Sequence, residues 1–188
     1  RAQDIGAGLR VLVNGRMGFA FTTDLSEQAL TELARAALTN ARNVEPDPFQ
    51  TIPQKPAHDY QSMPIYDPEL ASLSEHEKIE RVMAMERDAF AVDPRIRRIR
   101  KASASFSASE TLIMNTHGAE VSYRGTAASS SIEVVAEDNG ESQAGSDFDV
   151  SRFYRGLKIE EVGRRAARKA LDLLVARHID SVKAPAIL

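Results

Sequence analysis

A histidine and a glutamate at the start of a predicted helix are the first candidates for chemistry. His76-Glu77 resembles the opening of a motif in which two histidines, one helical turn apart, bind zinc beside a general-base glutamate. The second histidine would be needed at position 80 or 81, and those residues are Glu80 and Arg81. Glu77 also stands three residues after Ser74, the spacing of a capping box. We therefore interpret it as a helix cap and predict no metal ligand here.

The other candidate motifs fail for similar reasons. Gly6-Ala7-Gly8 precedes a predicted strand, whereas a phosphate loop must follow one and open a helix. Ser129-Ser130-Ser131 lies inside a predicted strand, outside any Gly-x-Ser-x-Gly elbow. The chain has no cysteine, which excludes disulfides and thiolate chemistry. The histidines stand at unrelated spacings: His58, His76, His117 and His178. We expect no catalytic, cofactor-binding or metal-binding residue in this chain.

Two charged stretches suggest binding instead of catalysis. The basic cluster has five cations in seven positions: Arg95, Arg97, Arg98, Arg100 and Lys101. It lacks the interleaved aromatics on which bases stack, and the formal net charge of −3 opposes nucleic-acid binding. A charged strand edge that discourages aggregation explains it equally well. The acidic stretch fits a solvated hairpin, or a rim that faces a cation or substrate: Asp138, Glu141, Asp147 and Asp149.

The first half of the chain predicts a hairpin and two helices. Strands at 9–13 and 17–22 flank Asn14-Gly15, a strong hairpin signal, and Asp24 with Glu27 predicts a helix cap. The first helix would bury Leu30, Leu33, Ala34, Ala37, Leu38 and Ala41. Residues 45–68 contain six of the eight prolines and predict a connection or arm. A second helix after Ser74 would bury Ile79, Val82, Met83 and Phe90 and end at Asp93-Pro94.

The second half predicts an antiparallel meander and a final helix. Serines at 103, 105, 107 and 109 alternate with Ala102, Ala104, Phe106 and Ala108, the period of a strand with one buried face. A strand at 112–115 leads into a turn, strands at 119–124 and 126–136 follow, and Asn139-Gly140 makes another hairpin. A helix at about 159–176 would bury Ile159, Val162, Ala166, Ala170, Leu173 and Leu174.

These elements indicate an α+β fold, with an antiparallel meander and hairpins packed against about three helices in a single domain, 1–188. Ser103, Ser105 and Ser107 would lie on the face of their strand opposite the buried one. Apolar runs of four or five residues are too short to span a membrane, so we expect a cytoplasmic protein. The tail from Ala184 to Leu188 reads as the beginning of another strand. We therefore expect a fragment, with more of the protein after Leu188 and before Arg1.

Several stretches, in order, resemble the TldD/PmbA family, which carries the older labels modulator of DNA gyrase and peptidase U62. The opening hairpin at 10–20 with Thr23-Asp24-Leu25-Ser26 is similar to the start of those proteins. Similar stretches then follow at 93–96, 115–118, 135–140 and 162–167. The resemblance covers residues 8–44 and 69–188. Tyr123-Arg124-Gly125-Thr126 and the spacing around Asp147-Phe148-Asp149 look more like the PmbA (TldE) subunit than the TldD subunit.

The resemblance implies one part of a two-subunit cytosolic metalloprotease that processes small or unfolded peptides. In such proteins an α+β N-terminal half precedes a mostly-β C-terminal half, which this chain would lack. The TldD-type subunit binds a divalent metal, expected to be zinc, through a His-Glu-x-x-x-His helix, a sequence not found here. This chain would be the N-terminal domain of a larger two-domain protein and would supply dimer contacts and walls of a substrate cavity, with a TldD-type partner or a second copy. A peptide could add to a sheet edge as a further strand, and the candidates to face it are Ser103, Ser105 and Ser107, or the polar face of residues 126–136. The alternative is a regulatory module that binds DNA gyrase or nucleic acid through the basic cluster.

Overall fold

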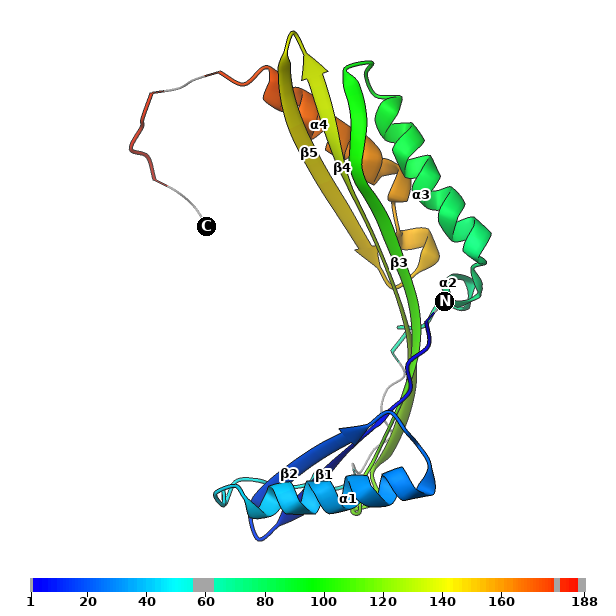
Figure 1. Ribbon diagram of the computed structural model, residues 1–188, viewed down its shortest axis with the longest axis vertical. Helices are drawn as coiled ribbons and strands as arrows, with labels where there is room; N and C mark the ends of the chain where they lie inside the picture. The colour runs from blue at the N-terminus through cyan, green and yellow to red at the C-terminus, as the bar shows by residue number, and fades with distance from the viewer. Residues whose placement is uncertain (1, 56–62, 178–179, 186–188) are drawn as a thin grey trace. The chain divides into compact units, whose positions relative to one another are not determined.

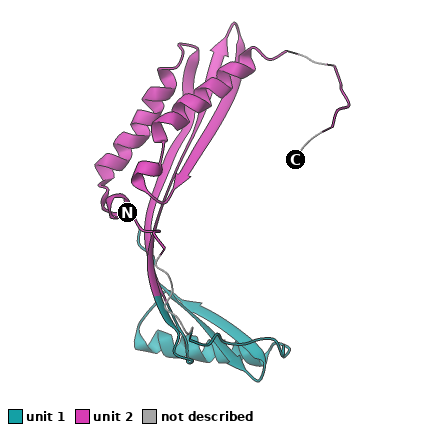
Figure 2. Ribbon diagram, turned by 180° about the vertical axis from the view of Figure 1, so that it is seen from behind, with its two compact units in different colours: residues 1–59, 113–121 teal, residues 60–112, 122–188 magenta. Residues whose placement is uncertain are grey.

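The computed structural model describes residues 2–55, 63–177 and 180–185 (Figure 1). The chain divides into two compact units (Figure 2). Unit 1 comprises residues 1–59 and 113–121, and unit 2 comprises residues 60–112 and 122–188. We had expected one domain, but the strands form two separate sheets, of two and three strands. None of the helices in the described residues is long and apolar enough to cross a membrane.

Unit 1 is built on the predicted hairpin. Strands β1 (Ala7–Val13) and β2 (Arg16–Thr22) are antiparallel, with Val13 opposite Arg16. Asn14 and Gly15 both have positive φ, 52° and 73°, as this tight turn requires, which confirms the Asn-Gly signal. The described residues of the proline-rich connection, 45–55 and 63–67, form neither helix nor strand.

Helix α1 (Glu27–Arg42) packs on this hairpin. A Cβ on Gly18 of β2 would lie 2.0 Å from the Ala37 carbonyl oxygen, so only glycine permits this approach. Ala37 and Ala41 are buried as predicted, whereas Leu30 and Leu38 flank the contact and stay about 40% exposed. The predicted cap was wrong by two residues: Ser26 caps the helix by accepting the Ala29 N–H, and Asp24 accepts the Ser26 N–H instead.

Unit 2 contains most of an antiparallel sheet in the order β3-β4-β5. The strands are β3 (Ile96–Met114), β4 (Glu120–Asp138) and β5 (Glu141–Ser151). We had expected a break near residue 112 and another near 125, but both long strands are continuous. Asn139 and Gly140, with φ of 48° and 85°, make the second predicted hairpin turn.

Three helices belong to unit 2: α2 (Pro68–Ser72), α3 (Glu75–Phe90) and α4 (Ile159–Leu174). The turn η1 (Tyr154–Gly156) precedes α4. Helix α4 lies close on β5 because Gly145 has no Cβ to meet Ala166 and Ala170. The predicted capping box of Ser74 and Glu77 opens α3. The α+β fold class is confirmed, with four α-helices among the described residues.

The predicted buried face of α3 was wrong for three of its four residues, and only Val82 packs against the core. Ile79, Met83 and Phe90 are 58%, 47% and 44% exposed, whereas Met85 and Ala89 are fully buried. The reason is long-range: a Cβ on Gly163 of α4 would lie 2.2 Å from the Met85 carbonyl oxygen, so α4 approaches α3 on the Met85 side. In α4 the predicted residues Ile159, Val162, Ala166 and Ala170 are buried, and Leu173 is half exposed.

Candidate functional surface

The sheet in unit 2 has a covered face and an open face. Alternate β4 residues, Ala128, Ile132, Val134 and Ala136, form the core with residues of α3 and α4. The residues between them point to the opposite face. Phe148 and Val150 of β5 lie opposite Ser131 and Ser129 on that second face and are 68% and 64% exposed. We call it the open face.

The structure places Ser103, Ser105 and Ser107 on the open face. Ala102 and Phe106 of β3 pack against the core, so the serines between them point the other way. Ser103 Oγ lies 2.9 Å from Ser131 Oγ on β4. Ser107 Oγ donates to the Ala127 carbonyl oxygen at 3.2 Å. Ser105 and Ser107 are exposed and Ser103 is half-buried. The role of this face toward a substrate stays a prediction.

Small side chains leave two shallow hollows on the open face. One is lined mainly by Ser105, Ser107, Ser129 and Val150. The other is lined by Lys101, Ser131, Glu133, Ser146, Phe148 and neighbouring groups at the β5 edge. Because hydroxyls can both donate and accept hydrogen bonds, such a surface can contact a peptide backbone whatever its side chains are. Phe148 and Val150 add an apolar ridge beside the serines.

The serines of the open face lack the partners that activate a nucleophile. Activation requires an adjacent base such as a histidine. In the described part of the chain, none of Ser103, Ser105 and Ser107 is hydrogen-bonded to a histidine or lysine. His117 instead contacts Gln54 and the Ile52 carbonyl in unit 1. Among the described residues these serines therefore have no base beside them that would activate a nucleophile.

Cross-strand ion pairs occupy much of the basic cluster. Arg98 pairs with Glu137 at 3.3 Å and Arg100 with Glu133 at 2.7 Å. Arg95 contacts Asp93 at 2.9 Å and Asp138 at 3.5 Å. The side-chain and backbone hydrogen bonds of Arg95 lower the pKa of Asp93 to about 2. Because the carboxylates already neutralise three of the five cations, little free charge remains for phosphates.

The acidic stretch is also engaged within the fold. Asp147 binds Arg165 and Lys169 of α4, the latter at 2.9 Å. Burial raises the pKa of Asp147, but the hydrogen bonds from Lys169 and Arg165 outweigh it, and the net pKa is lowered. Asp149 accepts the Lys158 N–H at 2.7 Å, just before α4. These contacts join β5 to α4 and to the residue just before it. We therefore interpret Asp147 and Asp149 as structural residues and not as ligands of a cation.

The remaining sequence candidates are not brought together. Within the residues that the structure describes, no group of three or more His, Asp or Glu side chains could hold a metal ion. Glu77 accepts the Ser74 N–H as a capping-box residue, and Glu80 pairs with Arg87. His58 and His178 lie outside the described residues. Sequence reasoning missed Phe148 and Val150, although their spacing in a strand was a signal for one shared face.

Family models match both units in part. A model described as "PmbA/TldA metallopeptidase central domain" matches residues 68–174, and one described as "PmbA/TldA metallopeptidase domain 1" matches residues 1–41. Metalloprotease PmbA of Escherichia coli O157:H7 is 33% identical over 187 residues, which cover 98% of this chain and 41% of that protein. A Metalloprotease TldD homolog of Haemophilus influenzae is 29% identical over 155 residues, which cover 80% of this chain and 31% of that protein.

Two solved structures share the fold. A Thermotoga maritima protein, named as a candidate modulator of a DNA gyrase, superposes with a TM-score of 0.83 at 23% identity, covering 96% of this chain and 40% of that one. TldE from Thermococcus kodakarensis superposes with a TM-score of 0.75 at 22% identity, and the match covers 89% of this chain and 42% of TldE. The chain thus spans about two fifths of the length of the curated PmbA relatives and of these two structures.

Proposed function

The chain belongs to the TldD/PmbA metallopeptidase family, and from that premise we propose that it is the N-terminal part of a PmbA-type subunit in a peptide-processing metalloprotease. Its role would be structural: contacts with a TldD-type partner and a wall of the cavity that admits small or unfolded peptides. A C-terminal, mostly-β domain would follow it in the parent protein. We expect this assembly in the cytoplasm.

The observation that supports this proposal most directly is the open face of the three-stranded sheet. Unfolded peptides share a backbone but no sequence, so a surface that admits many of them must contact the backbone. The hydroxyls of Ser103, Ser105 and Ser107, beside those on β4, meet this need, and the small side chains allow close approach. The exposed ridge of Phe148 and Val150 would contact apolar side chains of the peptide.

The metal of the family does not fit the described residues of this chain. The sequence lacks a His-Glu-x-x-x-His stretch, and no group of three or more His, Asp or Glu side chains among the described residues could hold a metal ion. No chemical step is therefore assigned to its residues. The proposal places the divalent metal, zinc by expectation, in a TldD-type partner.

The test mixes the parent protein with a TldD-type partner and follows cleavage of an unfolded peptide. Ser105→Trp would fill a hollow on the open face, so we expect the complex to form, by mass measurement, with the KM for peptide raised about tenfold or more. The matched control is Ser72→Trp on helix α2, away from the sheet. Failure of the parent to bind the partner, or equal kinetics for both variants, would contradict the proposal.

The alternative, a regulatory module for DNA gyrase or nucleic acid, rests on the names of two fold relatives and on the basic cluster. The ion pairs of Arg95, Arg98 and Arg100 disfavour it. Its test is DNA binding by the chain at two salt concentrations. Binding that weakens steeply with salt and disappears with Arg97→Glu and Lys101→Glu together would favour this alternative.

A further inference from the structure

The dipeptide Asn-Gly occurs twice in this chain, at Asn14-Gly15 and at Asn139-Gly140. Each dipeptide forms the tight turn of a hairpin, and all four residues have positive φ. The side-chain carbonyl of an asparagine can be attacked by the backbone nitrogen of the next residue. A glycine in that next position has no side chain to hinder the approach. The two turns therefore carry the same reactive sequence, and the structure shows how their surroundings differ.

The turn in unit 1 is held from one side by Asp47. The Asp47 N–H donates to the Gly15 carbonyl oxygen at 2.7 Å. A Cβ on Gly15 would lie 3.2 Å from the Asp47 carbonyl oxygen, so this segment lies close against the turn. The segment has local bonds of its own, because the Asp47 carboxylate accepts the Phe49 N–H at 2.9 Å and the Asp47 carbonyl accepts the Gln50 N–H at 3.2 Å.

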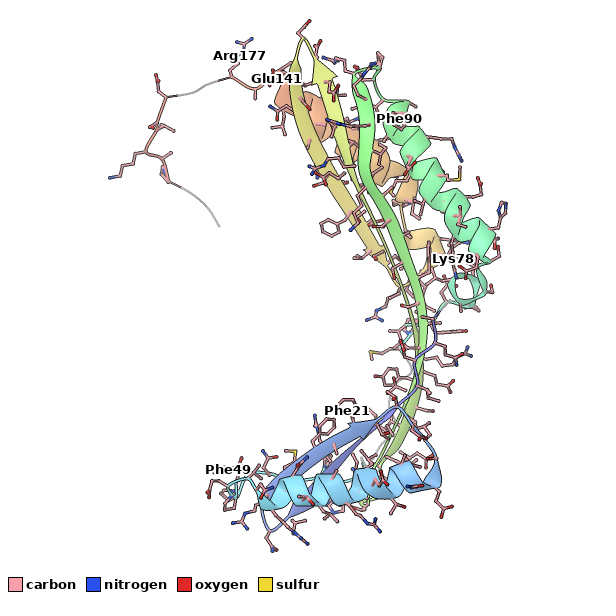
Figure 3. All side chains as sticks on the ribbon, viewed as in Figure 1. Phe21, Phe49, Lys78, Phe90, Glu141 and Arg177 are labelled. Carbon is pink, nitrogen blue, oxygen red and sulfur yellow. The ribbon has the colours of Figure 1, made fainter. Side chains whose placement is uncertain are left out.

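The turn in unit 2 has no such contact among the described residues. Apart from its chain neighbours, no described residue lies within 4 Å of where a Cβ on Gly140 would stand. The Asn139 side chain is exposed and makes no hydrogen bond in the described part of the chain. Asp138 and Glu141 are the pair that closes this hairpin, and Figure 3 labels Glu141 at its tip.

We propose that Asn139 is a site of spontaneous deamidation in the folded protein, and that the contact with Asp47 protects Asn14 from the same reaction. The Gly140 nitrogen attacks the Asn139 side-chain carbonyl carbon and a C–N bond forms. The side-chain nitrogen leaves as ammonia, taking the proton of the Gly140 N–H, and a five-membered succinimide remains. This inference does not rest on the proposed protease function.

Water completes the reaction by opening the succinimide. It adds a hydroxyl group to one of the two ring carbonyl carbons and returns a proton to the Gly140 nitrogen. Opening at the main-chain carbonyl of residue 139 gives isoaspartate, in which the chain continues through the former side chain. Opening at the former side-chain carbonyl gives aspartate. Either product replaces the neutral amide of Asn139 with a carboxylate.

The contact with Asp47 opposes the motion that this reaction requires. Ring closure needs rotation about ψ of the asparagine, which reorients the peptide group that follows it. In unit 1 that rotation would break the bond from the Asp47 N–H to the Gly15 carbonyl. Loss of one hydrogen bond of ordinary net strength makes this opening about threefold to tenfold rarer. In unit 2 only the exposed turn itself must open, and local opening is easiest in such segments.

Isoaspartate at residue 139 would disturb the end of the β4–β5 pairing. It adds one methylene to the backbone, whereas the register of a hairpin depends on the length and type of its turn. The new carboxylate would also stand beside Asp138 and near Glu141, which are already negative, and Asp138 contacts Arg95 at 3.5 Å. We therefore expect faster hydrogen exchange of the amides next to this turn after the reaction.

The test incubates the whole folded chain at mildly alkaline pH and measures both sites by mass spectrometry. Trypsin releases the two asparagines in separate peptides, 11–16 and 125–152, and each peptide contains one asparagine. Fragmentation locates the converted residue and separates isoaspartate from aspartate. Residue 139 should convert at least about threefold faster than residue 14. The rate should rise with pH, because the attacking nitrogen must lose its proton.

The same incubation in guanidinium chloride measures the reactivity of the two dipeptides without their turns. There the preference for residue 139 should largely disappear. Asn139→Gly is the matched variant, because Gly-Gly also fits this turn and has no side-chain amide. Its β4–β5 amides should keep their protection during incubation, while those of the wild type lose it. The proposal is overturned if residue 14 converts as fast as residue 139 in the folded chain, if the folded and unfolded ratios are equal, or if residue 139 converts only in the denaturant.

Discussion

The two compact units attach a helix to a sheet by the same contact but differ in what surrounds it. In unit 1 Gly18 of β2 lies against Ala37 and Ala41 of α1, and in unit 2 Gly145 of β5 lies against Ala166 and Ala170 of α4. In both, a glycine on the strand faces two alanines one helical turn apart. This pairing brings the helix backbone onto the strand, and any Cβ at the glycine would meet the helix backbone.

The surroundings of this contact differ between the units. Unit 2 adds α3, which packs on α4 where Gly163 meets Met85, and its core includes fourteen buried apolar residues. Unit 1 has one helix on a two-stranded hairpin, and the hairpin without that helix would be only marginally stable. All ion pairs in the described part of the chain belong to unit 2, among them those of Asp147. The comparison teaches that the same local contact can attach a helix in units whose cores and ion pairs differ widely.

Adding a methyl group at each shared glycine is expected to have the largest effect. Gly18→Ala and Gly145→Ala should each destabilise their own unit by about 3 kcal/mol or more, because the new Cβ meets backbone that cannot move alone. The measurement is amide hydrogen exchange, with the protection of each unit's amides compared with that in the wild type. Gly125→Ala is the control, since its Cβ would have ordinary contacts. Equal effects of Gly125→Ala and Gly145→Ala would contradict this account.

Truncation of Met85 tests the packing of α3 on α4, a second helix contact that unit 1 lacks. Met85→Ala should lower the free energy of unfolding of unit 2 by about 3 kcal/mol, because it leaves a cavity between α3 and α4. Met83→Ala on the exposed side of α3 should cost much less. Denaturant unfolding compares the free energy of unfolding of the two variants. Hydrogen exchange of the amides in unit 1 should not change in either variant.

Acid should loosen unit 2 before unit 1. The pKa of Asp147 is lowered in the fold, so its stabilising effect is present above its ordinary value near 3.8 and is lost as the pH falls through the folded pKa. Stability of unit 2, followed by urea unfolding, should therefore decline below about pH 4. Asp147→Asn should reduce stability at pH 7 and flatten this decline. If the free energy of unfolding of Asp147→Asn declined with falling pH as steeply as that of the wild type, other carboxylates would be responsible for the decline and this account would be wrong.

Two serines should have opposite effects of about 1 kcal/mol. Ser130 is buried on the covered face, and its hydroxyl has no hydrogen-bond partner among the described residues. Ser130→Ala should therefore stabilise unit 2 by about 1 kcal/mol.

Ser26→Ala should destabilise unit 1 by about 1 kcal/mol, because Ser26 caps α1. Asp24→Ala, at the position predicted from sequence as the cap, should cost less. Thermal unfolding distinguishes the two, and a larger cost at Asp24 would restore the original assignment.

Several features that depend on neighbouring residues were predicted correctly, although the cap of α1 was assigned to Asp24 instead of Ser26. The turns at Asn14-Gly15 and Asn139-Gly140, the capping box at Ser74 and the exposed serines of β3 all follow from spacing over a few positions. The inward face of α4 also followed from its period. The inward face of α3 did not, because Ile79, Met83 and Met85 are all apolar and only contact with α4 selects among them.

The sequence by itself determined where strands turn, where α3 and α4 run, and that three serines share one face of a strand. Local hydrogen bonds and two- or 3.6-residue periods carry that information, because they act over less than two helical turns. Only the tertiary structure decided that the hairpin and the long strands form separate sheets, that the helices cover the face opposite those serines, and that Arg98 and Arg100 meet Glu137 and Glu133. These features join residues more than thirty positions apart, and close packing around glycines such as Gly145 and Gly163 selects them.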